Sequence, residues 1–257
     1  MIRKGTQFVF LLFVLLPILV LLMLSFGKYW TYPAIFPSEF TWEHWLGLTQ
    51  TSSGLLQTVF QSIALSSVVS LLVTVSGFFV SKEIAYSTYR TVFIVFAYIP
   101  YVLSPILMAV ILQYFFSVTQ VSGTFFGVII AQFFIAFPFG VLVFLNFWNT
   151  EIKAMESVSY TLGASWWQTQ KRIVFTMAKP AVVLCYFQVF LISWFEYGLT
   201  NLIGIGKVNT LTIQVFNFIN EANIFYAALA CILLILPPIV LLLLNKRLLF
   251  LHQTLKS

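Results

Sequence analysis

The sequence predicts an all-α integral membrane protein with six transmembrane helices. Of its 257 residues, 61% are hydrophobic and only 8% are charged, whereas a soluble domain carries about a quarter charged residues. The mean hydropathy is +1.00. Apolar runs long enough to cross a bilayer, about 20 residues each, take up most of the chain. Because these runs lack the short alternating pattern of barrel strands, we expect helical spans.

The apolar runs give the predicted spans in order. We place them at about residues 8–26, 58–80, 91–116, 123–148, 181–203 and 224–245, within one transmembrane domain that covers residues 1–257. The first run is too long for a typical cleaved signal peptide, and no Ala-x-Ala site follows it, so we expect it to be retained.

Prolines lie inside several of the predicted spans, and those of the third and fourth spans are the candidates for bends. Pro100 and Pro105 lie in the third span and Pro138 lies in the fourth. A proline inside a span removes a backbone hydrogen bond and bends the helix. These prolines fit kinked helices that line a path, and ordinary proline usage in membrane helices explains them equally well.

The basic residues predict the orientation. Six spans put both termini on one side of the membrane, and eleven of the 13 basic residues fall on that side. Such an excess marks the cytoplasmic side, so we expect cytoplasmic termini and a cytoplasmic 149–180 segment. Because the charges sit at span ends rather than on one solvated face, the net charge of +6 does not indicate nucleic-acid binding. The eleven are Arg3, Lys4, Lys82, Arg90, Lys153, Lys171, Arg172, Lys179, Lys246, Arg247 and Lys256, against Lys28 and Lys207.

The sequence lacks the short motifs that mark common nucleotide-binding, metal-binding and catalytic sites. It has no phosphate-binding Gly-x-x-x-x-Gly-Lys-Ser/Thr, no His-Glu-x-x-His, no Cys-x-x-Cys and no Gly-x-Ser-x-Gly, and it contains no Asp. Cys185 and Cys231 lie inside predicted spans, and His44 and His252 fall on opposite predicted sides. We therefore expect no enzyme activity, no metal and no cofactor in this chain. Any uphill transport would draw its energy from a partner or an ion gradient.

The segment 149–180 is the longest polar interval between the long apolar runs, and it is patterned. Gly163 predicts a bend between two short helices, and Glu156, Ser159, Gln170 and Lys171 lie largely off an apolar stripe. Such a helical pair fits docking onto a partner, and an amphipathic helix that rests on lipid headgroups is the alternative. The stripe, spaced at steps of three, four or seven, consists of Met155, Val158, Leu162, Trp166, Ile173 and Met177.

This segment resembles the cytoplasmic coupling loop of permease subunits of binding-protein-dependent ABC importers. Glu156 is followed after seven residues by Gly163, and Ile173 comes ten residues later. Ser157 and Val158 replace the two alanines of the family's pattern. The matching residues continue through Gly163-Ala164-Ser165-Trp166-Trp167-Gln168-Thr169 and end at Lys179-Pro180.

Other segments extend the resemblance to roughly residues 55–245. They are Tyr98–Pro105, Ala131–Pro138 and Phe195–Gly198. Phe175-Thr176 stands where the family has Leu-Pro, and the missing proline leaves the second helix free to run further.

The resemblance implies a type I ABC importer permease in the bacterial cytoplasmic membrane. Two permease subunits, identical or different, would form the path, and an external binding protein would deliver a solute. Two cytoplasmic ATPase subunits, which hold ATP and Mg, would receive the coupling loops. The implied substrate branch is polyamine, ferric iron or thiamine. The residues implied in ATPase coupling are Glu156, Gly163, Ala164, Ser165, Trp166, Trp167 and Ile173.

Glu196 is the clear ionisable residue inside a predicted span. A carboxylate there costs ~2.5–3.5 kcal/mol on insertion scales for comparable charges, so we expect it to face the path or a partner group. It could bind a cationic solute, or it could serve as a packing or gate residue, which we favour. Pro105 and Pro138 are the other candidates for the path or gate. An ion-coupled secondary carrier and a membrane scaffold remain alternatives, but a carrier usually shows several ionisable residues at membrane depth.

Overall fold

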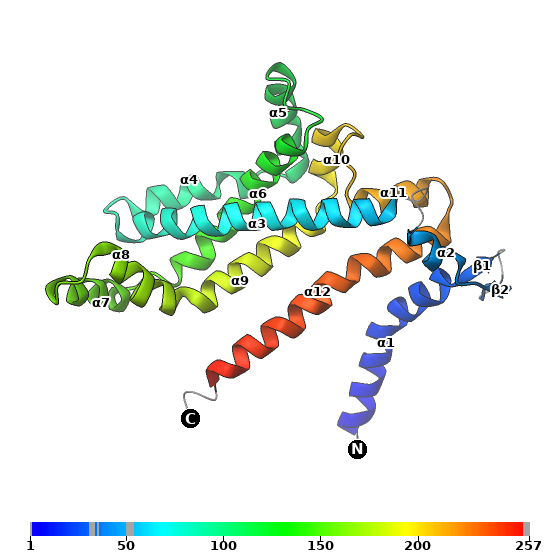
Figure 1. Cartoon of the computed structure of the whole chain (residues 1–257), viewed down its shortest axis with the longest axis horizontal. Coiled ribbons are helices and arrows are strands. Elements are labelled where there is room, and N and C mark those ends of the chain that lie inside the picture. The colour runs from blue at the N-terminus through cyan, green and yellow to red at the C-terminus, as the bar shows by residue number, and fades with distance from the viewer. Residues whose placement is uncertain (1, 31–33, 35, 50–53, 254–257) are drawn as a thin grey trace. The chain divides into compact units, whose positions relative to one another are not determined.

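The computed structural model describes residues 2–30, 34, 36–49 and 54–253, and most of them are helical (Figure 1). The all-α class is therefore confirmed. The long helices are α1 (Ile2–Ser25), α3 (Leu55–Tyr86), α4 (Arg90–Val102), α5 (Pro105–Val118), α6 (Phe125–Leu145), α9 (Phe175–Trp194) and α12 (Ile224–Gln253). The shorter elements are β1 (Gly27–Tyr29), β2 (Glu39–Phe40), α2 (Glu43–Leu46), η1 (Gly47–Thr49), α7 (Thr150–Thr161), α8 (Trp166–Thr169), η2 (Gln170–Val174), α10 (Gly198–Gly204) and α11 (Leu211–Asn220).

Several helices are long and apolar enough to cross a membrane. Within the described residues there are four, or five if the bent pair Arg90–Pro100 and Pro105–Val118 forms one span. The predicted first span falls on α1, whose described apolar part, Leu15–Ser25, is shorter. The count of six therefore stays a prediction. The four helices are Leu55–Tyr86, Phe125–Leu145, Trp166–Trp194 and Ile224–Leu243.

The predicted third span, 91–116, is two helices rather than one kinked helix. α4 ends at Val102 and α5 begins at Pro105, and the two pieces meet at 83°. Ser104, with φ −57° and ψ 138°, is extended, as expected for a residue that precedes a proline. Pro105 then occupies the first turn of α5, where its missing N–H leaves no hydrogen bond unmade. By contrast, α6 continues through the buried Pro138.

The predicted fifth span, 181–203, differs from the structure at both ends. One apolar helix of 29 residues runs from Trp166 through η2 and α9 to Trp194. The second half of the polar segment 149–180 is thus continuous with the span, as the missing proline allows. The chain breaks after Trp194, and residues 198–204 form the separate helix α10.

The described chain divides into two compact units. The first consists of residues 1–62 and 209–240. In it, His44 stacks on Phe225 at 5.7 Å, and its Nε2 lies 3.0 Å from the Gly27 carbonyl oxygen. A Cβ atom at Gly27 would come within 2.7 Å of the Phe225 ring, so only glycine permits this approach. Leu211 N–H donates to Ser62 Oγ over 2.7 Å, which ties α11 to the start of α3.

The second unit, residues 63–208 and 241–257, contains the predicted coupling segment. Its helices α3 and α6 cross closely: a Cβ at Gly77 would lie 3.0 Å from the Gly140 carbonyl carbon. Gly123, by contrast, has φ +73° and forms a turn. The single transmembrane domain over residues 1–257 stays a prediction. The buried side chains around the α3–α6 crossing and the segment that follows it include Val69, Val73, Phe78, Phe144, Trp148, Ile152, Val174, Ala178 and Val189.

Candidate coupling site

The segment that links α6 to α7 is anchored to the end of α3. Trp148 is buried, and its Nε1–H donates to Ser81 Oγ over 2.9 Å. Asn149 then caps α7, because its side-chain oxygen accepts from the Ile152 N–H at 2.9 Å. The Asn149 carbonyl accepts from the Tyr86 hydroxyl at 3.3 Å. The start of α7 is thus fixed by contacts to α3 and by its own cap.

A tight bend separates α7 from α8. Gly163 has φ +82°, a left-handed conformation that favours glycine, and a Cβ there would meet open space. The Ala164 N–H donates to the Ser159 carbonyl over 3.0 Å across the bend. Ser165 and Gln168 form a reciprocal capping box at the start of α8, with distances of 3.3 and 3.0 Å. The predicted pair of helices is therefore present, and glycine sets its geometry.

Glu156 points into the protein rather than toward solvent. It is 7% exposed. Its Oε1 lies 2.6 Å from Lys82 Nζ on α3 and accepts from Gln170 Nε2 on η2 at 2.8 Å. The Lys82 ammonium also lies 5.2 Å from the centre of the Trp148 ring, a cation–π arrangement. One carboxylate oxygen thus joins three elements: α3, α7 and η2.

A second polar contact closes the same hairpin. Ser159 Oγ lies 2.8 Å from Thr169 Oγ1, and both side chains are buried. The Thr169 hydroxyl also contacts the Ser165 carbonyl at 3.1 Å. Because buried polar groups are costly unless they are paired, these contacts favour one geometry of the α7–α8 pair.

Much of the apolar stripe is exposed to solvent. Leu162 is 80% exposed, Trp167 is 72% exposed and Trp166 is 54% exposed. The two indole rings stack on each other at 5.3 Å between centroids. Ile173 is half-buried within the π-helix η2. An exposed apolar patch of this kind marks a surface for a protein partner or a membrane. Met155, Val158 and Met177 of the same stripe are exposed as well.

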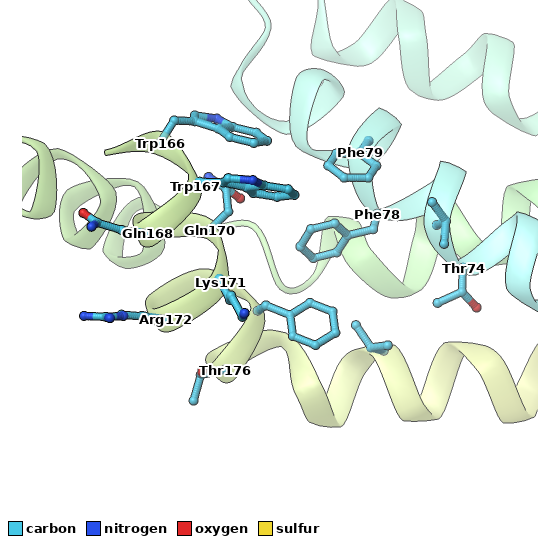
Figure 2. Close-up of a pocket in the computed structure, with 13 residues that line it drawn as sticks. Thr74, Phe78, Phe79, Trp166, Trp167, Gln168, Gln170, Lys171, Arg172 and Thr176 are labelled. Atoms are coloured by element: carbon cyan, nitrogen blue, oxygen red, sulfur yellow. The ribbon is translucent and has the colours of Figure 1, made fainter. Parts of the chain in front are cut away.

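A groove of about 1090 Å³ lies between this segment and α3. Figure 2 shows both indoles on one wall, directed toward Phe78 and Phe79, while Arg172 points away from the groove. The full lining is Thr74, Val75, Phe78, Phe79, Trp166, Trp167, Gln168, Gln170, Lys171, Arg172, Phe175, Thr176 and Val182.

Glu196 lies away from this groove and caps a helix. Its carboxylate accepts from the Leu199 N–H at 2.6 Å and from the Thr200 N–H at 2.8 Å, the first turn of α10. The Thr200 hydroxyl donates to it over 2.6 Å and accepts from Gln132 Nε2 of α6 at 2.7 Å. A negative charge is stabilised at a helix N-terminus by the free N–H groups and the macrodipole.

The polar chain beyond Glu196 joins several helices. Ser193 of α9 donates to Gln132, and its hydroxyl lies 3.2 Å from Ser66 of α3. These contacts fit the packing interpretation of Glu196. Within the lining residues that the structure describes, neither Pro105, Pro138 nor Glu196 borders the groove beside the tryptophans.

The sequence reasoning missed the inward partners of Glu156. It treated Lys82 as a charge at a span end and Gln170 only as a residue off the apolar stripe. It also missed a row of buried hydroxyls along α3, although their spacing of four residues is visible in the sequence. The row consists of Thr58, Ser62, Ser66, Ser70 and Thr74.

Comparison with known proteins identifies the family to which the chain belongs. Residues 69–250 match the family described as "Binding-protein-dependent transport system inner membrane component". A relative, the "Probable transport system permease protein NifC" of Clostridium pasteurianum, is 27% identical over 218 residues, which cover 74% of this chain and 76% of the relative. The family match takes in α6, the α7–α8 hairpin and α9. The chain is therefore a multi-pass membrane protein that belongs to the binding-protein-dependent transport system inner membrane components, as a type I ABC importer permease.

Proposed function

We propose that this chain is the transmembrane subunit of an ATP-driven solute importer and that its α7–α8 hairpin docks on a cytoplasmic ATPase. A second permease subunit, identical or different, completes the path, and an external binding protein delivers the solute. ATP and Mg are held by the ATPase. The observation that carries the proposal is the orientation of the hairpin, whose polar side chains are paired inside while its tryptophans are exposed.

The hairpin has the physical properties of a docking element. Large aromatic side chains dominate the binding energy of protein interfaces, and the stacked pair Trp166 and Trp167 offers such anchors. The bend at Gly163 and the capping box at Ser165 fix where these rings project. A surface that is already ordered loses less conformational entropy when it binds. These features support docking over a loose connection between two spans.

The substrate class rests on the resemblance. We keep polyamine, ferric iron or thiamine as the proposed cargo, and we assign Glu196 a packing or gate role rather than the recognition of positive charge. Its carboxylate already accepts three hydrogen bonds from the first turn of α10. Ligand binding by the partner binding protein, measured by calorimetry with spermidine, ferric citrate and thiamine, tests the class. If the binding protein binds none of the three compounds, the proposed substrate class is excluded.

Reconstitution tests the energy source. The chain is co-expressed with an ATPase, a second permease subunit and a binding protein of such a transport system from the same organism, and the complex is placed in vesicles. We expect the ATPase to co-purify and uptake to require ATP. Uptake that survives nucleotide depletion and stops when the ion gradient is collapsed would favour the secondary carrier instead.

Cysteine labelling tests the orientation. With Cys185 and Cys231 replaced by alanine, the variant Trp167→Cys carries one thiol on the exposed face of the hairpin. We expect an impermeant maleimide to label it in inside-out vesicles and not in intact cells. Labelling of intact cells would place the hairpin outside and overturn the proposed docking.

A further inference from the structure

We infer that Lys82 is a positioning residue that fastens the α7–α8 hairpin to the inner end of α3, so that motion of the hairpin is passed to α3. This inference rests on the proposed function. It also changes the role expected for Glu156, which then acts by holding the hairpin rather than by touching the ATPase. The two charged atoms lie 2.6 Å apart, and their residues are separated by 74 positions in the sequence.

The Lys82–Glu156 pair differs from an ordinary surface ion pair. Its side chains are 20% and 9% exposed. The other ion pair of the described residues, Lys28–Glu43, spans 3.7 Å, and its side chains are 36% and 68% exposed. Exposed pairs contribute little to stability, whereas removing one partner of a buried pair leaves an uncompensated charge. The inner pair can therefore hold two segments together.

Further contacts around the Lys82 ammonium also attach the hairpin to α3. The Trp148 ring lies against it at 5.2 Å, and Trp148 itself donates to Ser81, the residue before Lys82. Gln170 donates to the same Glu156 oxygen that Lys82 contacts. Through these contacts the end of α3 is joined to Trp148 before α7, to Glu156 within α7 and to the π-helix η2.

α3 is suited to transmit a displacement. It is one continuous helix from Leu55 to Tyr86, and residues on it are packed tightly against α6 at Gly77 and Gly140. Packed interiors transmit strain because they contain few voids. A pull on the hairpin must either move the end of α3 or break a largely buried ion pair. As long as Lys82 keeps its contact with Glu156, we expect the end of α3 to move with the hairpin.

Hydrogen exchange of the full chain in lipid nanodiscs tests the fastening without any partner. We expect Lys82→Met and Glu156→Gln to speed amide exchange over residues 150–170 by about 10-fold or more, because both remove the charge pair. Lys179→Met and Glu151→Gln remove exposed charges from the same region and should leave exchange unchanged. Exchange in Lys82→Met that equals the wild type would overturn the inference.

The charge exchange Lys82→Glu with Glu156→Lys gives the sharpest test. Lys82→Glu alone places two carboxylates together, and Glu156→Lys alone places two ammonium groups together. We expect the double variant to restore slow exchange. If both single variants fail to accumulate in the membrane, restored accumulation of the double variant supports the pair. A double variant no better than the worse single variant overturns it.

A coupling measurement separates positioning from simple stability. In the reconstituted complex, Lys82→Met should keep the ATPase bound but lower several-fold the stimulation of ATP hydrolysis by the binding protein, and the charge exchange should recover it. Unchanged stimulation in Lys82→Met would overturn the positioning role. If the ATPase never associates with the wild-type chain, the proposed function fails, while the hydrogen-exchange result still judges the Lys82–Glu156 contact.

Discussion

Two carboxylates of this protein show two different ways to satisfy a charge. Glu156, in the α7–α8 hairpin, is paired with Lys82 and Gln170, which belong to other elements. Glu196, inside the fifth predicted span and just after the end of α9, is satisfied by the N–H groups and hydroxyl of residues three and four positions further on. The first carboxylate depends on tertiary structure, and the second depends mainly on a local helix start.

The difference explains what each region can do. A carboxylate held by its own next turn stays satisfied as long as α10 keeps its first turn, so it suits a fixed point in the membrane interior. A carboxylate held by distant elements connects them, and it loses its partners if they separate. On the proposed coupling function, the hairpin is thus the region whose movement we expect other helices to follow.

The largest expected effect is at Glu156. Glu156→Ala leaves Lys82 without its partner, and we expect the free energy of unfolding of the second unit to fall by about 3 kcal/mol. Thermal unfolding in detergent and hydrogen exchange of residues 150–170 measure it. Glu151→Ala, an exposed position in the same helix, is the control. Equal free energies of unfolding of the two variants would show that the ion pair does not stabilise the hairpin.

The next largest effect is expected at Trp167. This residue tests the exposed side of the hairpin, whereas Glu156 tests the buried side. The side chain is 72% exposed, so we expect Trp167→Ala to leave folding intact. It should weaken ATPase binding by about 2 kcal/mol, or about 30-fold. Binding of the ATPase to nanodiscs that contain the variant measures this. Trp42→Ala, also exposed, serves as control. Undiminished affinity would exclude Trp167 as an anchor.

A smaller effect is expected at Glu196. Glu196→Ala removes the cap of α10, and we expect a loss of stability of about 1–2 kcal/mol. Glu196→Gln keeps an acceptor oxygen for the N–H groups and should recover part of that loss. The same thermal measurement compares the two. A transport defect in Glu196→Gln without any change in stability would instead indicate that the charge itself acts on the solute.

The smallest free-energy change of the four, with a clear functional readout, is expected at Gly163. Gly163→Asp forces a side chain into a left-handed conformation at a cost of about 1 kcal/mol. We expect insertion to persist while ATP hydrolysis is uncoupled from uptake. Gly206→Asp is a matched control, because Gly206 also has positive φ, at +68°, and open space around it. Normal uptake in Gly163→Asp would count against the coupling role.

Much of the architecture was predictable from composition and pattern. Long apolar runs indicated helical spans, and the hairpin with its bend at Gly163 followed from a 3.6-residue period and a glycine. Helix ends were harder to place. The sequence predicts a kinked helix at Pro105, whereas the structure has a break before it. A proline within an apolar run fits both a bent helix and the start of a new one.

The candidate site was only partly predictable. The stripe of Leu162, Trp166 and its neighbours could be recognised as one face, but periodicity does not say which face turns inward. In the structure Glu156, Ser159 and Gln170 are buried, because Lys82 and Gln170 offer Glu156 partners there, whereas Lys171 is exposed. Neither partner is close to Glu156 in sequence. No local pattern therefore pointed to them.

The sequence by itself determined the class of molecule, its apolar helices and the position of the hairpin, because these depend on local composition and on spacing along one chain. Only the tertiary structure decided that the hairpin's polar side chains are buried and its tryptophans exposed. It also decided that Glu156 meets Lys82 and that Glu196 caps α10. Pairing of a buried charge depends on which elements come within a few ångströms, and that is settled when helices pack.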